Sequence, residues 1–311
     1  MSKYLVWTLL AVMLLACVVV AEDQPSSVMA GILTRDGIGA RAIALGTSFT
    51  ALADDTTAGY YNPAGLAFLP GIRTGGMYES KFDPSLGINF QYMSATYMID
   101  SLDLGTGLTL VRRNDKAIPT IGGSFDASET LLLLSGGWDF AQSLELDGFD
   151  GLAVGANVKV YLSSGYEDAN ARGIGMDLSA LFLYDIGRGW IRIGFRSSDV
   201  FGSSIQWRDT RNEIKEVVPW GQHIGIAFSL LEPALTATAD ATVFLGQPDL
   251  NSLHVGVEYT LFGISLRAGF KDGTPVIGAG IRALDWLRVD LAMVFHGDLG
   301  QSLIASTEFS F

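Results

Sequence analysis

From Thr74 onward the chain is a succession of alternating segments, and this alternation limits its possible folds more than any other feature. Each segment has about ten residues, apolar ones alternating with small or polar ones, and clusters of Gly, Asp, Pro or Ser separate the segments. Such period-two alternation predicts β-strands whose two faces meet different environments. An all-β, antiparallel fold is therefore expected. The fourteen predicted strands span 74–82, 86–98, 103–113, 129–144, 150–166, 171–184, 191–202, 221–231, 234–244, 253–262, 264–273, 275–284, 287–296 and 301–311.

The two faces of these strands differ in content. One face carries large apolar residues such as Leu152, Val158 and Met176, whereas the other carries glycine and isolated charges. Alternation alone does not say which face is covered, because a soluble sandwich buries its apolar face. In a membrane barrel the apolar face would meet lipid and the charged face would line the lumen. The expected lumen charges are Lys159, Asp177, Arg192, Arg196, Asp240, Glu258, Arg267, Lys271, Arg282, Arg288, Asp290 and Glu308.

The connections between the strands favour a barrel in a membrane. After the first 21 residues the chain has no apolar run of about 18 residues, so a spanning helix is not expected. Lipid then admits only a closed barrel, which satisfies every backbone hydrogen bond. Long connections at 114–128, 203–220 and 245–252 follow odd strands, and tight ones at Glu232-Pro233, Gly263 and Asp285-Trp286 follow even strands. We therefore predict a transmembrane antiparallel β-barrel of about fourteen strands.

The last predicted strand adds support for an outer-membrane location. Residues 303–311 alternate strictly, and the strand carries Phe309 and the terminal Phe311. This pattern resembles the terminal strand that the barrel assembly machinery recognises in bacterial outer-membrane proteins. Phe309 and Phe311 are therefore the expected assembly signal.

The stretch from Gly37 to Leu69 is the one long segment that does not alternate. Ala42, Leu45, Phe49 and Leu52 recur at three- and four-residue steps, which predicts a helix, and the pair Asp54-Asp55 ends that pattern. Asn62-Pro63 then interrupts the chain, because proline fixes its own φ and disfavours a helical residue before it. A helix, a turn and a second helix are expected ahead of the first strand.

This stretch resembles the N-terminal signature of the FadL-like and PorV/PorQ outer-membrane families. The matching pieces are Gly39 to Ala42, Ala53 to Asp55 and Asn62 to Ala67. The resemblance implies a short helical plug that fills the barrel and gates it. The residues expected to form the contact surface and gate are Phe49, Asp54, Asp55, Tyr60, Tyr61, Asn62, Pro63 and Phe68.

The first residues have the pattern of a secretory signal peptide. A single cation, Lys3, precedes an apolar run, and small residues up to Ala21 precede the polar sequence that starts at Glu22. Cys17, the only cysteine, lies in a sequence like a lipoprotein cleavage box, but the residues that follow it stay apolar. The expected organisation is a signal peptide at 1–21, a plug segment at 22–73 and a barrel at 74–311, with a retained anchor as the alternative for the first segment.

The sequence gives little support for nucleic-acid binding, cofactor binding, metal binding or catalysis. A formal net charge of −13 disfavours nucleic acid as a partner. Two glycine-rich matches to a dinucleotide-binding pattern lack the strand and helix that such a site needs. His223, His254 and His296 lie on separate strands without the short spacing of metal motifs. No catalytic residue, metal or cofactor is therefore predicted, and an enzyme is not expected.

Three functions remain open from the sequence. The FadL-like resemblance implies passage of hydrophobic small molecules across the outer membrane. The PorV/PorQ resemblance implies a scaffold or docking role in protein export, with a secretion-system protein as partner. A soluble secreted β-protein is the third alternative. For either barrel the expected partners are outer-membrane lipid and the barrel assembly machinery.

Cleavage is expected between Ala21 and Glu22, with no lipid on Cys17, because the apolar run continues beyond the cysteine. The intact mass of the mature protein measures this directly. A mass that begins at a diacylated Cys17 would show that the lipoprotein site is used instead.

Overall fold

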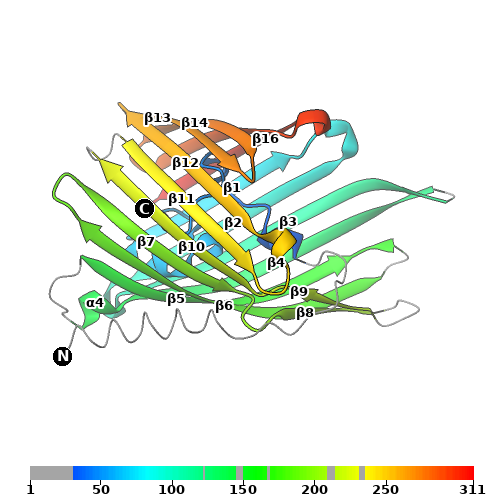
Figure 1. The fold of residues 1–311 in the computed structure, drawn as a ribbon, viewed down its shortest axis with the longest axis horizontal. Coiled ribbons are helices and arrows are strands. Elements are labelled where there is room, and N and C mark those ends of the chain that lie inside the picture. The colour runs from blue at the N-terminus through cyan, green and yellow to red at the C-terminus, as the bar shows by residue number, and fades with distance from the viewer. Residues whose placement is uncertain (1–30, 122, 145–149, 167–168, 209–213, 231–234) are drawn as a thin grey trace.

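Fourteen antiparallel strands close into one barrel (Figure 1). The computed structural model describes residues 31–121, 123–144, 150–166, 169–208, 214–230 and 235–311, so the predicted signal peptide, Cys17 and the predicted turn at Glu232-Pro233 lie outside the described residues. Pairing of β1 with β16 and of β5 with β6 completes the ring. The ring strands are β1 (Ile72–Ser80), β2 (Ile88–Ile99), β3 (Leu104–Thr120), β4 (Gly123–Asp139), β5 (Gly151–Ser164), β6 (Asn170–Asp185), β7 (Gly189–Ser198), β10 (Gly221–Leu230), β11 (Leu235–Phe244), β12 (Ser252–Leu261), β13 (Ile264–Lys271), β14 (Thr274–Leu284), β15 (Leu287–Phe295) and β16 (Gln301–Ser310).

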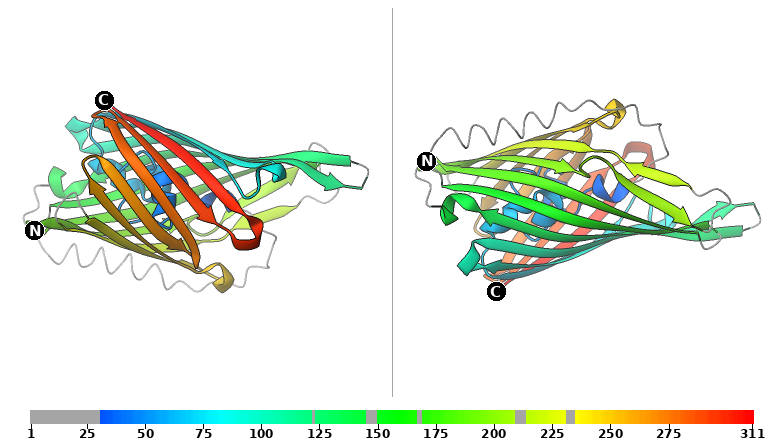
Figure 2. Two further views of the ribbon diagram at one scale, coloured as in Figure 1. Left: turned by 90° about the horizontal axis from the view of Figure 1, so that it is seen from above. Right: turned by 90° about the horizontal axis from the view of Figure 1, so that it is seen from below.

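The barrel has two different rims. At the C-terminal rim, where β1 begins and β16 ends, tight connections such as Phe262-Gly263 and Asp285-Trp286 join the strands. The backbone of Phe311 pairs there with Ile72, with N to O distances of 2.8 and 3.1 Å. The opposite rim, here called the hairpin rim, carries the connections 81–87 and 245–251 and two long hairpins. Figures 1 and 2 show these hairpins projecting beyond the other strands.

Two of the predicted long loops are largely strand, so those predictions were wrong. At 114–128 the strands β3 and β4 continue past a register shift between Asp115 and Ile118, where Ala117 has a positive φ. At 203–220 the chain forms β8 (Ser203–Arg208) and β9 (Lys215–Val218), which extend the wall through pairing of β8 with β6. A bulge at 199–202 shifts this pairing, and polar residues along both hairpins hid the alternation.

The outer surface of the barrel is apolar. Met93, Leu134 and Ile174 are 67%, 64% and 72% exposed, and many other outward side chains are Leu, Ile or Val. Exposing so much apolar surface to water is unfavourable, whereas hydrocarbon accepts it without cost. The sheet closes on itself with its apolar face outward, so the alternative of a soluble sandwich is wrong.

Residues 31–71 lie inside the ring (Figure 2). They contain η1 (Ile32–Thr34), α2 (Ala40–Ala44), α3 (Ala58–Tyr61) and η2 (Pro63–Phe68). We call residues 31–71 the plug. No helix in the described ranges is long and apolar enough to cross a membrane.

The predicted helix through Leu52 is wrong, because α2 ends after Ala44. Gly46 has φ 68°, and the amides of Gly46 and Thr47 bond to the carbonyls of Ile43 and Ala42. This is the Schellman arrangement that terminates helices, and glycine adopts the required left-handed conformation without strain. Leu45, Phe49 and Leu52 are nevertheless 0% exposed, so the apolar pattern reflected burial and not a continuous helix.

Glycine on the inner face lets the plug backbone touch the wall. A Cβ atom at Gly256 would overlap the backbone of Leu45, and one at Gly194 would overlap the carbonyl of Thr50. A Cβ at Gly105 would likewise overlap the carbonyl of Leu66. These three glycines of the predicted lumen face are thus sites of close backbone approach.

Candidate functional site

The plug has an aromatic centre. The ring of Tyr61 lies 5.3 Å from that of Phe49 and 5.0 Å from that of Tyr60, measured between centroids. The Tyr60 hydroxyl donates to the carbonyl of Leu33, and the Tyr61 hydroxyl donates to the carbonyl of Ile38. All three rings are buried. The two hydroxyls therefore tie the first residues of the plug to α3.

Asn62 joins three parts of the structure. Its side-chain oxygen accepts from Ala64 N at 3.1 Å and so caps η2, which Pro63 begins. Its amide nitrogen donates to Thr50 O at 2.7 Å within the plug and to Ala180 O at 3.1 Å on β6. Asn62 is 0% exposed, so none of these bonds can be replaced by water without opening the plug.

Barrel side chains bond to the plug backbone between its helices and near the end of α3. One oxygen of Asp240 accepts from the amides of Phe49 and Thr50 at 2.9 and 2.8 Å. Arg192 donates to Leu52 O at 2.7 Å, and Arg196 donates to Tyr60 O. A buried backbone group without a partner costs free energy, so these wall residues compensate for the short helices of the plug.

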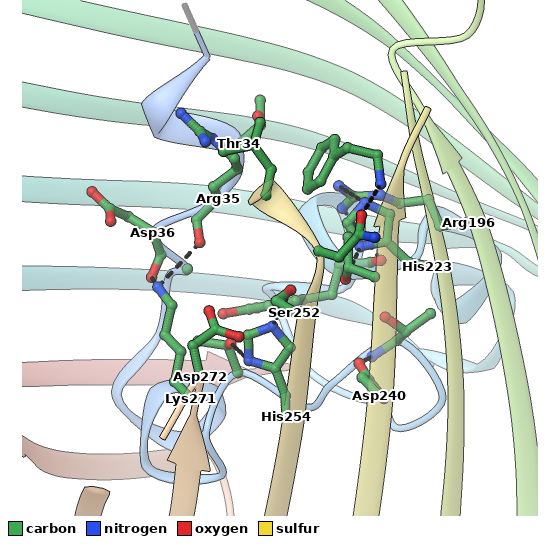
Figure 3. A pocket seen from close by; sticks show the side chains of 18 of the residues that line it. Thr34, Arg35, Asp36, Arg196, His223, Asp240, Ser252, His254, Lys271 and Asp272 are labelled. Carbon is green, nitrogen blue, oxygen red and sulfur yellow. Dashed lines mark hydrogen bonds between the residues drawn. The ribbon is translucent and has the colours of Figure 1, made fainter. Parts of the chain in front are cut away.

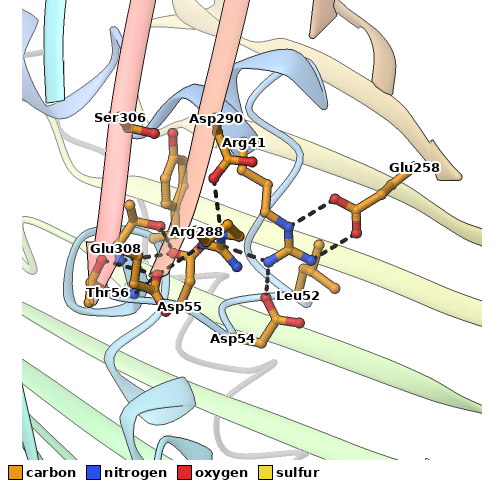
Figure 4. A network of polar contacts seen from close by, with 12 residues as sticks. Arg41, Leu52, Asp54, Asp55, Thr56, Glu258, Arg288, Asp290, Ser306 and Glu308 are labelled. Atoms are coloured by element: carbon orange, nitrogen blue, oxygen red, sulfur yellow. Dashed lines mark hydrogen bonds and ion pairs between the residues drawn. The ribbon is translucent and has the colours of Figure 1, made fainter. Parts of the chain in front are cut away.

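An ionic network joins α2 and the pair Asp54-Asp55 of the plug to the barrel wall (Figure 4). Arg41 of α2 reaches Glu258 on β12 with both contacts at 3.0 Å and also pairs with Asp54 and Asp55. Arg288 of β15 pairs with Asp55 at 3.0 Å. Wall pairs extend the network, namely Arg267 with Glu258 and Asp290, Arg288 with Asp290 and Glu308, and Arg73 with Glu308.

The charge of Asp55 depends on this network. Burial opposes ionisation of Asp55, but Arg288 and Arg41 outweigh that effect and hold its pKa below the ordinary value. The other oxygen of Asp55 accepts from the amide and hydroxyl of Thr57 at 2.9 and 2.6 Å. Asp55 therefore connects the ionic network to the start of α3.

The remaining expected site residues lie in several places. Lys159 pairs with Asp177 at 2.6 Å beside the plug, and Lys271 donates to the carbonyls of Arg35 and Asp36. Arg282 is exposed on β14. Phe68 is half-buried at the end of η2, Phe309 stacks on Trp286 at 6.1 Å, and Phe311 is 72% exposed.

Two residues at the centre of these contacts were missed by the sequence analysis. Arg41 was part of the quoted signature but was not assigned a role, although a single cation in an apolar segment signals a buried ion pair. Asp199 pairs with Lys159 at 2.7 Å from the bulge between β7 and β8. Its position could not be inferred, because alternation does not locate a bulge.

A cavity of about 470 Å³ lies between the plug and the wall (Figure 3). It extends from Thr50 and Tyr60 of the plug to Asp249 and Asp272 at the hairpin rim. We call this cavity the vestibule. Its lining includes Arg196, which also holds the plug, so the vestibule ends directly on the plug.

Comparison with known proteins gives a fold and no family. No family model and no curated protein matches the chain. Among solved structures it is similar to the CymD monoaromatic hydrocarbon channel, with a TM-score of 0.57, 11% identity and coverage of 88% of this chain and 98% of that one. The toluene transporter TodX of Pseudomonas putida matches with a TM-score of 0.55 and 14% identity, over 88% of this chain and 98% of that one. A FadL homologue of Pseudomonas aeruginosa matches with a TM-score of 0.52 and 10% identity, over 85% of this chain and 96% of that one. The chain therefore has the fold of these barrels.

Replacing Arg41 by Met should loosen the plug. The change leaves Glu258, Asp54 and Asp55 with less positive charge around them, and removing one partner of a buried ion pair typically costs about 3–5 kcal/mol. Limited proteolysis in detergent should cut the plug faster, while heat-modifiable gel migration still reports a closed barrel. Arg282→Met, which alters an exposed arginine, is the matched control. Equal cleavage rates in both variants would show that the network does not hold the plug.

Proposed function

We propose that this protein is a bacterial outer-membrane barrel that passes small molecules and uses the plug as its gate. An N-terminal signal would export it, and the outer-membrane lipid and the barrel assembly machinery would be its partners. The apolar outer surface and the fold support this location. Phe49, Asp54, Asp55, Tyr60, Tyr61, Asn62, Pro63 and Phe68 are then the gate residues, because the plug positions all of them.

The observation that carries the proposal is how the plug is held. The wall holds it by separate side-chain contacts, among them those of Asp240, Arg192, Arg196 and Glu258, and within the described residues no strand of the barrel forms a ladder with the plug. Such contacts can break while the strand ladders of the barrel remain intact. The vestibule leads from the hairpin rim to this plug, so a solute from that side would meet the gate directly.

A hydrophobic cargo is the finer part of the proposal. The resemblance to FadL-like proteins implies it, and two of the similar structures are described as a hydrocarbon channel and a toluene transporter. The aromatic centre of the plug, Phe49 with Tyr60 and Tyr61, offers an apolar surface to a solute once the plug shifts.

A docking role in protein export is the second candidate. The plug is held in the lumen by many contacts, and the two hairpins β3–β4 and β8–β9 project from the hairpin rim (Figure 2). Ile121 at the tip of the first hairpin is fully exposed. A PorV/PorQ-like barrel that binds a secretion-system protein would use such projections and would not need the plug to move.

Asn62→Ala and Pro63→Gly should open the gate without unfolding the barrel. Losing the partners of a buried polar group typically costs about 1–3 kcal/mol, which is small beside a complete ring of strand ladders. We expect higher conductance in planar bilayers and faster uptake of a hydrophobic probe, with unchanged heat-modifiable migration.

The matched control is Asn114→Ala, because Asn114 lies on the β3–β4 hairpin and the hydrogen bonds described for its amide group, with Asn89 and Arg112, do not involve the plug. This variant should behave as wild type. If the plug variants also conduct and take up probe as wild type does, gating is wrong and the docking role gains support.

A further inference from the structure

The lining of the vestibule contains charged and hydrogen-bonding groups. Arg196 of β7 and Asp240 of β11 form part of its wall, and each is only 3% exposed (Figure 3). Arg35 of the plug and Lys271 of β13 also line it, and Asp249 and Asp272 border it at the hairpin rim. The rings of Tyr61 and Phe244 and the side chains of Ile32 and Leu250 add apolar surface. The lining therefore combines many hydrogen-bonding groups with apolar surface.

Neutral hydrogen-bonding side chains reach the open part of the vestibule. Asn251 is exposed there, and Thr34 and Ser252 are partly exposed. Hydroxyl and amide groups both donate and accept hydrogen bonds. These side chains therefore match a molecule that both accepts and donates hydrogen bonds.

The charges around the vestibule favour neither anions nor cations. Asp36 is neutralised by Lys81, with a distance of 2.7 Å between Nζ and Oδ2. The remaining lining charges are three cations, Arg35, Arg196 and Lys271, and three carboxylates, Asp240, Asp249 and Asp272. Because opposite charges are interspersed around the vestibule, the attraction of a charged solute to some lining groups would be offset by its repulsion from others.

A hydroxyl group fits these conditions, because it donates one hydrogen bond and accepts others without carrying charge. The volume of about 470 Å³ lies within the usual range of small-molecule sites. We propose that the vestibule binds a small uncharged molecule with several hydroxyl groups, of the size of a mono- or disaccharide. This goes beyond gated passage, since binding above the plug does not require the plug to move.

The test is isothermal titration of the purified full-length mature barrel with glucose and sucrose. The barrel is kept in a polyoxyethylene detergent, which has no sugar head group. Toluene and inorganic phosphate serve as apolar and anionic comparison probes. Saturable binding of a sugar, with weaker binding of toluene and phosphate, is the expected result.

Two neighbouring variants locate the site. Ser252 lines the vestibule, so Ser252→Trp should fill it and weaken sugar binding by about tenfold or more. Leu253, the next residue, points outward and is 65% exposed, so Leu253→Trp should leave sugar binding unchanged. Heat-modifiable migration checks that both barrels are folded.

Three results would overturn the proposal: sugars that do not bind, toluene or phosphate that binds more tightly, or sugar binding that Ser252→Trp does not weaken. The first would mean that the vestibule holds only water. Each of these outcomes leaves gated passage intact, because conductance and probe uptake by the Asn62 variant test that function separately.

Discussion

A closed ring of fourteen strands encloses more space than its own side chains fill, and the rest of the structure answers that constraint. The plug fills the space, but a segment with only short helices brings backbone amides and carbonyls into a buried setting. Asp240, Arg192 and Arg196 pair with those groups from the wall. Glycines such as Gly256 let the two backbones approach closely enough for the contacts to form.

The ionic contacts give the plug a defined position more than they add stability. A buried ion pair adds little stability compared with apolar packing of the same shape, but separating the two charges in a buried site is costly. Any position of the plug that separates these pairs is therefore disfavoured. Arg41 meets its carboxylates only when α2 is seated, and Arg288 meets Asp55 only then. Placement therefore depends on a few contacts, and this is the property that a gate needs. The vestibule above the plug extends the same polar character toward the hairpin rim.

The sequence predicted the barrel well because alternation reports directly on the two environments of a strand. It predicted the glycine and charge content of the inner face but not the reason for the glycines, which depends on where Leu45 and Thr50 pass. The prediction of a helix through Leu52 was wrong because burial on all sides imitates helical periodicity, while Gly46 ends the helix locally. The prediction of a loop at 203–220 was wrong because a bulge at Asp199 shifts the strand register, and a single sequence does not reveal such a shift.

The most direct measurement compares probe uptake when the plug is locked to the wall by a disulfide and when it is released. The hydroxyl oxygens of Ser48 and Thr238 lie 3.0 Å apart, and Cys17 is the only cysteine of the chain, so the double variant Ser48→Cys/Thr238→Cys can join plug and barrel by one disulfide. Uptake of a hydrophobic probe into liposomes is compared before and after reduction. If the plug must move, the oxidised protein passes no probe and reduction restores wild-type uptake. Equal uptake in both states would contradict a gating plug.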